Sequence, residues 1–254
     1  MKRIVFSLVL TFFAMQSFSQ KPQHYYVEIK TNKGVILAQL YNQTPKHRDN
    51  FKKLVAERYY DGILFHRVIK NFMIQGGDPE SKLATTTSLT VLGNGGPEYK
   101  INAEIQEGLF HKKGVLGAAR DNNPAKSSSG SQFYIVQGRK FTDAGLDSLV
   151  TMRMQGKQFS AQQREAYKTI GGTPHLDGNY TVFGEVIEGV VAVDQIASVN
   201  TNSADRPIVD EPMYMRLMTR REAINIEREM NGLKPKNGFF TKLFDGFKSK
   251  NYKL

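Results

Sequence analysis

Residues 64–78 read LFHRVIKNFMIQGGD, and this stretch decides how the rest of the chain is interpreted. Its short apolar runs, taken as 63–68 and 72–75, have the length and composition of β-strands, and two glycines follow the second run. Arg67 stands in the first run beside aromatic residues, where an isolated arginine is usually a surface or rim group. The stretch therefore predicts two short strands, and the role of Arg67 depends on its context.

Six further strand-like runs lie outward from this stretch and make eight in all. They span residues 25–31, 35–41, 114–119, 132–137, 180–187 and 213–219. Thr31-Asn32-Lys33-Gly34 supplies the asparagine and glycine of a tight hairpin. Many short strands with glycine-rich connections predict a mainly β domain, built as a barrel or a sandwich. A closed antiparallel barrel is favoured because it leaves no unpaired edge.

Two helices are predicted beside these strands. Thr44 is a good N-cap, and Pro45 after it suits the first helical position, so an amphipathic helix is expected over 45–57. The spacing of apolar residues predicts a short helix over 190–197.

Residues 138–172 interrupt the pattern of strands. Ser160 and Gln163 form a capping box that opens a helix to about Thr169. A second helix is predicted over 142–154. We therefore expect a helical insertion in a β domain.

Two later stretches carry fixed patterns of their own: residues 129–135 read SGSQFYI and residues 176–184 read LDGNYTVFG. Together with 64–78, in this order and spacing apart from the insertion, they resemble the cyclophilin family of peptidyl-prolyl isomerases. The resemblance covers roughly residues 25–220, outside the insertion. It implies a closed eight-stranded antiparallel barrel capped by two helices, which agrees with the eight predicted strands.

The resemblance also implies a site. Arg67 is the expected catalytic hydrogen-bond donor, and Gln75 is expected to orient it and to bond the client backbone. The apolar pocket for the proline ring is expected from Phe72, Met73, Tyr134 and Leu176. The neighbouring subsite is expected from Ala119, the backbone near Arg120, and Gln132. Tyr180 stands in place of a pocket histidine of the family and is expected to close the pocket.

The chemistry of prolyl isomerisation suits an arginine. A peptide bond resists rotation by about 18–20 kcal/mol because the nitrogen lone pair is delocalised. A guanidinium that donates a hydrogen bond to the prolyl nitrogen stabilises the twisted amide more than the planar one, and this lowers the barrier. The step needs no proton transfer, nucleophile, metal or cofactor, so none is expected. His66 is then expected to be a hydrogen-bonded structural residue.

Other kinds of site lack support in the sequence. Cysteine is absent, which excludes disulfides, a thiol nucleophile and a thiolate metal site. The five histidines lack the spacing of metal ligands. The formal net charge is +11, but residues 232–254 hold six lysines and one aspartate, so much of the excess sits in a tail. A basic face interleaved with aromatic residues is missing, and nucleic-acid binding is not expected.

The chain also departs from the family pattern. Tyr134 stands where many members have phenylalanine, so its hydroxyl must reach water or a partner. His175 replaces the tryptophan through which eukaryotic members bind cyclosporin. The insertion departs most, since it begins after Tyr134 and ends before Leu176, both predicted pocket residues. Two hypotheses follow for 138–172: a lid or wall that selects clients, or a helical decoration on the side of the barrel.

The start of the chain resembles an export signal. Lys2 and Arg3 precede an apolar run at 4–15, which is typical of a signal peptide. Cleavage is expected after Ser19, and an uncleaved membrane anchor is the alternative. We therefore expect residues 1–19 to direct the protein to a periplasm, with secretion beyond it as the second destination.

The far end of the chain, residues 221–254, is expected to form a basic amphipathic extension. Apolar side chains recur there at helical spacing: Phe240, Leu243, Phe244 and Phe247. This pattern is compatible with docking on the barrel, with disorder until a partner is met, or, as the least favoured interpretation, with a helix on a membrane surface.

The sequence therefore predicts a monomeric isomerase that assists the folding of exported proteins. Its expected partners are proline-containing clients, unfolded or partly folded. Two alternatives stay open: a non-catalytic module that binds proline segments, and a holdase chaperone that uses the apolar surface of the insertion and the extension. Arg67 favours the isomerase, because binding alone would not need this residue.

Overall fold

A computed structural model of the chain describes residues 21–84, 91–154 and 156–236. Residues 24–217 form one compact unit, and residues 218–236 belong with 21–23 to a second. The predicted signal peptide and the apolar residues of the predicted extension, 237–254, lie outside the described residues.

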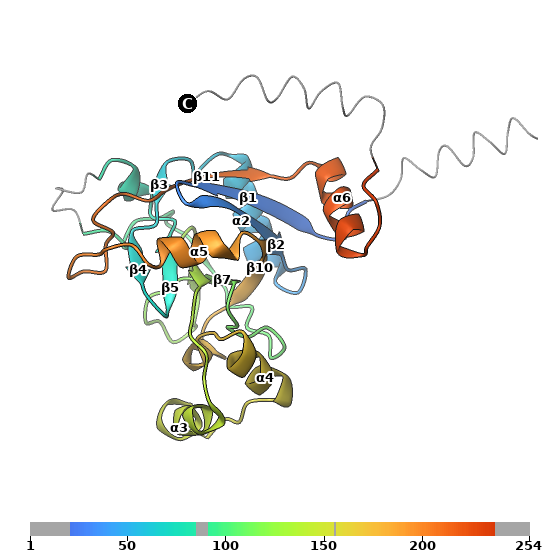
Figure 1. The fold of residues 1–254 in the computed structure, drawn as a ribbon. Coiled ribbons are helices and arrows are strands. Elements are labelled where there is room, and N and C mark those ends of the chain that lie inside the picture. The colour runs from blue at the N-terminus through green and yellow to red at the C-terminus, as the bar shows by residue number, and fades with distance from the viewer. Residues whose placement is uncertain (1–20, 85–90, 155, 237–254) are drawn as a thin grey trace, which may run out of the picture. The chain divides into compact units, whose positions relative to one another are not determined.

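The first unit is built on one curled antiparallel sheet of nine strands (Figure 1). In chain order these are β1 (Tyr25–Thr31), β2 (Gly34–Leu40), β3 (Ile63–Leu64), β4 (Arg67–Ile69), β5 (Met73–Gly76), β7 (Val115–Ala118), β9 (Phe133–Val136), β10 (Val182–Glu188) and β11 (Pro212–Leu217). Their spatial order is β3-β11-β1-β2-β10-β7-β9-β5-β4. The hairpin between β1 and β2 turns where predicted, with Thr31 paired to Gly34, and the φ of 132° at Gly34 suits glycine.

The predicted closed barrel of eight strands is wrong in both number and closure. The run 63–68 is not one strand, because Leu64 pairs with Pro212 of β11 whereas Arg67 pairs with Gln75 of β5. This change of partner places β3 and β4 at the two ends of the strand order. Among the described residues no ladder joins these ends, so the sheet curls like half a barrel and stays open.

A separate two-stranded ladder joins β6 (Lys100–Ile101) to β8 (Ser128–Ser129). The sequence analysis missed it, because a strand of two residues is too short to display the alternation that identifies strands.

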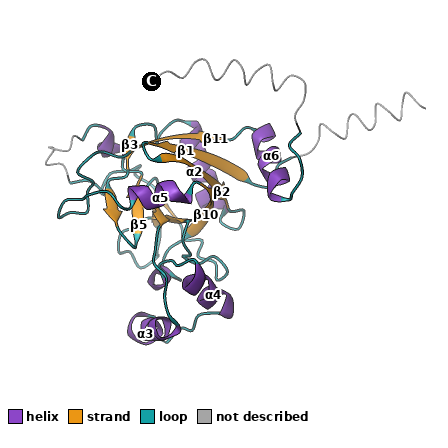
Figure 2. Cartoon of the chain, in the orientation of Figure 1, coloured by secondary structure: helices purple, strands orange, loops and turns teal. Residues whose placement is uncertain are grey.

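Two of the predicted helices, α2 (Pro45–Ala56) and α5 (Val190–Ile196), share the main core with the sheet (Figure 2). Phe51 of α2 lies in an aromatic cluster. Its ring centroid is between 5.1 and 5.3 Å from those of Tyr60, Phe133 and Phe183.

The start of α2 is capped from a distance and not by its predicted N-cap. The Thr44 side chain makes no capping hydrogen bond. The Glu104 carboxylate accepts hydrogen bonds from the backbone N–H groups of Lys46 and His47, both at 3.0 Å. A carboxylate is well placed there, because the first N–H groups of a helix lack partners within it and carry partial positive charge.

The segment 138–172 contains the two predicted helices, α3 (Asp143–Arg153) and α4 (Ala161–Thr169), and the capping box of Ser160 with Gln163 is present. Arg139 and Gly172 exchange backbone hydrogen bonds of 3.3 and 3.0 Å, so the segment leaves the sheet and returns at one point. It has a small core of its own, packed on Phe110. That core consists of Leu146, Val150, Phe159 and Tyr167, with Phe141, Met154 and Ala166 around them.

The second unit contains α6 (Arg220–Met230), which begins at a capping box of Thr219 with Glu222. Within this unit the Glu227 carboxylate accepts a hydrogen bond from the backbone of Gln23 at 2.6 Å. None of the helices in the described parts of the chain has the length and apolarity to cross a membrane.

Candidate active site

A pocket of about 160 Å³ opens between β4, β5, β9 and the loops beside them. Nine of the ten predicted site residues line it: Arg67, Phe72, Met73, Gln75, Ala119, Arg120, Tyr134, Leu176 and Tyr180. All nine lie outside 138–172, so in this structure the segment is not a wall of the pocket.

The tenth residue, Gln132, lies behind the lining and holds Gln75. The Gln75 amide donates to the Gln132 side-chain oxygen at 3.1 Å, and the Gln132 amide donates to the carbonyls of Gly93 and Gly95 at 2.9 and 2.8 Å. This direction of donation fixes the rotamer of Gln75 and leaves its side-chain oxygen as an acceptor.

The register of β4, β5 and β9 aligns three residues of the pocket lining, Arg67, Gln75 and Tyr134. We call the Tyr134 ring the floor of the pocket. Arg67 of β4 lies opposite Gln75 of β5, and Gln75 lies opposite Tyr134 of β9. Directly opposed residues of antiparallel strands share a face of the sheet. The three side chains therefore follow one another across three neighbouring strands, although 67 and 134 are far apart in the chain.

The Arg67 side chain is 45% exposed, and its Nε lies 3.4 Å from a carboxylate oxygen of Asp205. The backbone carbonyl of Asp205 accepts from Val68 at 2.8 Å, which ties its loop to β4. Sequence reasoning missed Asp205, because no local pattern links a loop aspartate to an arginine 138 positions away.

The apolar lining is aromatic on two sides. Phe72 stacks on His175 with ring centroids 5.4 Å apart, and Tyr180 meets Tyr134 edge-on at 6.0 Å. Phe72 lies in the turn before β5 and Met73 is its first residue, so strand alternation does not separate them. Both therefore reach the pocket.

The hydroxyl of Tyr134 has a buried hydrogen-bond partner, as expected for a tyrosine at a position where many members of the family have phenylalanine. It lies 2.8 Å from Nε2 of His111, a residue that the sequence analysis did not single out. Burial raises the pKa of Tyr134 well above its ordinary value, so the hydroxyl stays protonated.

His66 is buried, but the hydrogen bonding predicted for its side chain is not found among the described residues. Neither ring nitrogen has a hydrogen-bond partner among the described residues. Burial lowers the pKa of His66 to about 4, so the ring is neutral at pH 7. His66 also lies outside the pocket lining, and the structure gives it no catalytic contact.

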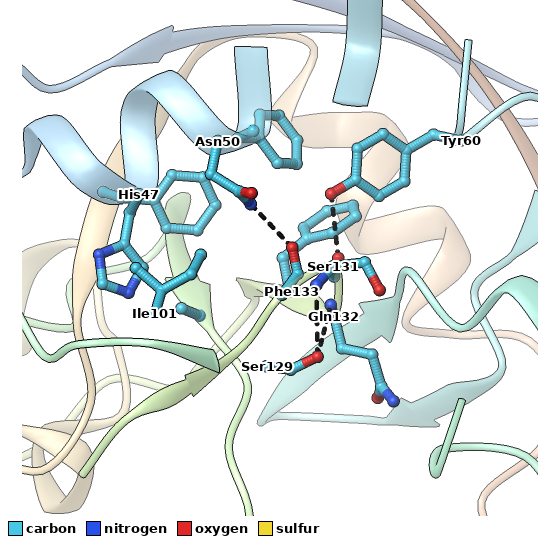
Figure 3. Close-up of a pocket in the computed structure, with 12 residues that line it drawn as sticks. His47, Asn50, Tyr60, Ile101, Ser129, Ser131, Gln132 and Phe133 are labelled. Atoms are coloured by element: carbon cyan, nitrogen blue, oxygen red, sulfur yellow. Dashed lines mark hydrogen bonds between the residues drawn. The ribbon is translucent and has the colours of Figure 1, made fainter. Parts of the chain in front are cut away.

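A second, much smaller cavity has Gln132 among its lining residues (Figure 3). Its volume of about 10 Å³ is that of a single water. Asn50 donates to the carbonyl of Gly130 at 2.7 Å there, and Tyr60 donates to that of Ser131 at 3.0 Å. These contacts join α2 and the residues after it to the strand region that carries Gln132.

His47, which also borders this cavity, resembles the middle member of a hydrolase triad. Its Nδ1 lies 2.7 Å from Glu104 and its Nε2 lies 3.0 Å from the Ser128 hydroxyl. Burial lowers the pKa of His47, but Ser128 is only 1% exposed. A nucleophile must reach its substrate, which the buried Ser128 hydroxyl cannot do. The hydrogen-bonded set of Glu104, His47 and Ser128 therefore supports the fold. In the described ranges 21–84, 91–154 and 156–236, no group of three His, Cys, Asp or Glu side chains is arranged to hold a metal.

Comparison with known proteins agrees with this geometry. The family model "Cyclophilin type peptidyl-prolyl cis-trans isomerase/CLD" matches residues 26–216. A Staphylococcus haemolyticus protein named "Putative peptidyl-prolyl cis-trans isomerase" is 35% identical over 185 residues, covering 72% of this chain and 86% of that protein. A Streptococcus pyogenes protein named "Putative bifunctional phosphatase/peptidyl-prolyl cis-trans isomerase" is 37% identical over 190 residues, 72% of this chain. The chain spans only 36% of that longer relative.

Solved structures give the same result. A crystal structure of a Cryptosporidium parvum cyclophilin type peptidyl-prolyl cis-trans isomerase has a TM-score of 0.57 and 25% identity, over 77% of this chain and 98% of that one. A second crystal structure of it, in the presence of the dipeptide Ala-Pro, has a TM-score of 0.56 and 25% identity, over 76% of this chain and 99% of that one. Family model, relatives and fold agree, and the chain belongs to the family of cyclophilin-type peptidyl-prolyl cis-trans isomerases.

Proposed function

We propose that Arg67 catalyses the isomerisation by stabilising the twisted X-Pro amide, and that the clients are exported proteins in the course of folding. The observation that carries the mechanism is an exposed guanidinium opposite Gln75, at the edge of a pocket that Phe72, Met73 and Leu176 also line. The apolar side chains of the lining suit a proline ring, and the similar protein crystallised in the presence of Ala-Pro supports that ligand class.

Arg67 is better placed than the other arginine of the lining. Arg120 donates to the carbonyls of Asn179 and Asp121, both at 2.9 Å, and its guanidinium carbon lies 4.8 Å from the centre of the Tyr180 ring. These contacts hold Arg120 to the pocket rim. Arg67 has the long contact to Asp205, a distance at which little of its donor capacity is used.

The energies are sufficient for this mechanism. Uncatalysed exchange at X-Pro takes tens to hundreds of seconds, so an acceleration of a thousandfold asks for about 4 kcal/mol. A charge-assisted hydrogen bond from Arg67 to the prolyl nitrogen forms fully only when the amide is twisted, and it therefore acts on the barrier. Gln75, held by Gln132, supplies an acceptor that aligns a client backbone N–H.

A short Ala-Pro peptide tests the role of Arg67. Turnover is measured for residues 20–254, for Arg67→Ala, and for Arg58→Ala as the matched control, since Arg58 is an exposed arginine paired with Asp61 at 2.7 Å outside the pocket. We expect about a hundredfold loss or more in Arg67→Ala and none in the control. Turnover of Arg67→Ala within twofold of the natural protein would contradict the mechanism.

Export is proposed from the basic start and apolar run of residues 1–19. We expect the protein in the periplasm or medium to begin at Gln20 when its terminus is sequenced. An intact terminus on protein held inside the cell would refute export. Assistance to folding is tested with a protein whose refolding waits on a proline: acceleration must disappear in Arg67→Ala, whereas suppression of aggregation that survives would favour the holdase alternative.

A further inference from the structure

The segment 138–172 is linked to the pocket by hydrogen bonds, although it contributes nothing to the lining. Its C-terminal end is hydrogen-bonded to the loop before β7, which carries His111. The backbone of Thr173 donates to the His111 carbonyl at 2.8 Å, and that of Lys113 donates to the Gly171 carbonyl at 2.9 Å. His111 is thus enclosed between the segment and the pocket.

A continuous line of buried hydrogen bonds runs from α4 to the pocket floor. The Tyr167 hydroxyl of α4 lies 2.6 Å from Asp177, and the Gln163 amide adds a contact of 3.2 Å to the same carboxylate oxygen. The other oxygen of Asp177 lies 2.8 Å from Nδ1 of His111. Nε2 of His111 lies 2.8 Å from the hydroxyl of Tyr134.

Chemistry assigns a direction to every contact. A carboxylate only accepts, so Tyr167 donates to Asp177 and Nδ1 of His111 carries a proton. When the imidazole is neutral, Nε2 is the acceptor and Tyr134 donates to it. Burial raises the pKa of Tyr167 as it does that of Tyr134, so both hydroxyls remain donors. The order of donation therefore fixes the Tyr134 hydroxyl on the side of His111.

Packing explains the ring of Tyr167 but not its hydroxyl. The ring fills the small core of the segment, with centroids 5.6 Å from Phe110 and 5.7 Å from Phe159. A phenylalanine would fill the same space. The hydroxyl is aimed at Asp177, which is itself buried and also accepts from the backbone N–H of His111 at 2.8 Å.

We propose that Tyr167 is a positioning residue: through Asp177 and His111 it fixes the Tyr134 ring as the floor of the proline pocket. The segment 138–172 then sets affinity for the client from outside the pocket. This inference rests on the proposed function only in taking the pocket as the proline site. It predicts an effect on ground-state binding, because the floor contacts the proline ring in the planar and the twisted amide alike.

A double-mutant cycle tests the proposal with residues 20–254 and a short Ala-Pro peptide. Kd is measured by NMR titration, and kcat from the rate of cis–trans exchange of the bound peptide. The proteins compared are the natural protein, Tyr167→Phe, Tyr134→Phe and the double variant. Thr169→Ala is the control, since it removes a hydroxyl of the same helix that donates to the Glu165 carbonyl at 2.7 Å and, among the described residues, makes no contact with Asp177. We expect Tyr167→Phe to raise Kd about fivefold with kcat within about twofold, and to have no further effect once Tyr134 is phenylalanine.

Two results would overturn the proposal. One is a lower Tm with unchanged Kd in Tyr167→Phe, which a purely structural role predicts. The other is the same rise of Kd in both backgrounds, which would mean that the effect does not pass through Tyr134. Gln163→Ala breaks a contact to the same carboxylate and also weakens the capping box of α4, so Ser160→Ala, which weakens the box alone, is its control; Kd must rise in the first variant and not in the second. Because Kd needs no turnover, failure of Arg67 catalysis and failure of positioning are separable.

Discussion

Two chains of hydrogen-bonded side chains are buried in this molecule, each made of a carboxylate, an imidazole and a hydroxyl. They have the same chemistry and different surroundings. In one, His47 lies between the Glu104 carboxylate and the Ser128 hydroxyl, at 2.7 and 3.0 Å. The hydroxyl at its end is sealed in the protein, and the cavity beside His47 has room for a single water.

In the other chain, His111 lies between Asp177 and the Tyr134 hydroxyl, both at 2.8 Å. Here the hydroxyl belongs to a side chain that lines a pocket of about 160 Å³. The order of carboxylate, imidazole and hydroxyl is that of a hydrolase triad in both places, and neither hydroxyl is a nucleophile. The role of such a hydrogen-bonded chain therefore depends on what its terminal hydroxyl contacts.

The largest effect is expected when the carboxylate of the first hydrogen-bonded chain, Glu104, is removed. Glu104→Ala removes the cap of α2 together with the partner of His47, and we expect a loss of about 3 kcal/mol of unfolding free energy. The Kd for an Ala-Pro peptide should stay unchanged. Asp177→Ala should also destabilise the fold, but with a raised Kd. Urea unfolding and peptide titration measure both quantities. Equal Kd changes in the two variants would remove the distinction between the chains.

A third buried histidine sharpens the comparison, because His66 has no hydrogen-bond partner among the described residues. Its pKa of about 4 lies below the ordinary value of 6.5, so the unfolded chain binds the proton first as pH falls. Stability is therefore lost from about pH 6.5 downward, by roughly 2 kcal/mol between pH 7 and pH 5. Unfolding of the natural protein and of His66→Gln at both pH values tests this, and an identical pH dependence would be the contrary result.

A smaller effect is expected when the pocket floor is displaced directly. Gly117 of β7 lies opposite Tyr134, and a Cβ at this position would overlap the tyrosine ring. Gly117→Ala should therefore raise the peptide Kd about fivefold, since the ring must move and its new position is poorly packed. Gly108→Ala is the control, because no atom lies within 4 Å of its Cβ position. A Kd that changes equally in both variants would argue against a fixed floor.

The smallest effect is expected at the exposed edge of the pocket. Asp205→Asn removes the charge beside Arg67 and tolerates the φ of 60° at this position. Exposed ion pairs contribute about 0–1 kcal/mol, so turnover should fall by no more than about twofold. Asp143→Asn, on the exposed side of α3, is the matched control. A tenfold loss in Asp205→Asn alone would make this aspartate part of the catalytic arrangement.

Much of the site was predictable because its residues lie within a few fixed stretches. Arg67, Phe72, Met73 and Gln75 stand in one run, and the later stretches carry Tyr134 and Leu176. The β-rich character, the hairpin at Gly34 and the helices of the 138–172 segment are local as well. Tight turns, capping boxes and helical periodicity are decided within a few residues, so the sequence displays them.

The remainder depends on partners distant in the chain. The break between β3 and β4 arises because neighbouring residues pair with β11 and with β5, which no local pattern reveals. Glu104 caps a helix 57 residues before it, and Asp177 meets His111 across 66 residues. Such contacts are set by tertiary packing, so the cap, the open sheet and the support of the pocket floor had to come from the structure.

The central claim is that Arg67 acts on the twisted amide and not on the bound ground state. NMR line-shape analysis of an Ala-Pro peptide gives its Kd and the exchange rate within the complex, for the natural protein and for Arg67→Ala. If Arg67 stabilises the twisted amide, Kd changes by less than about threefold while exchange in the complex slows by about a hundredfold or more. Unchanged exchange in the complex, with all lost turnover explained by a weaker Kd, would contradict it.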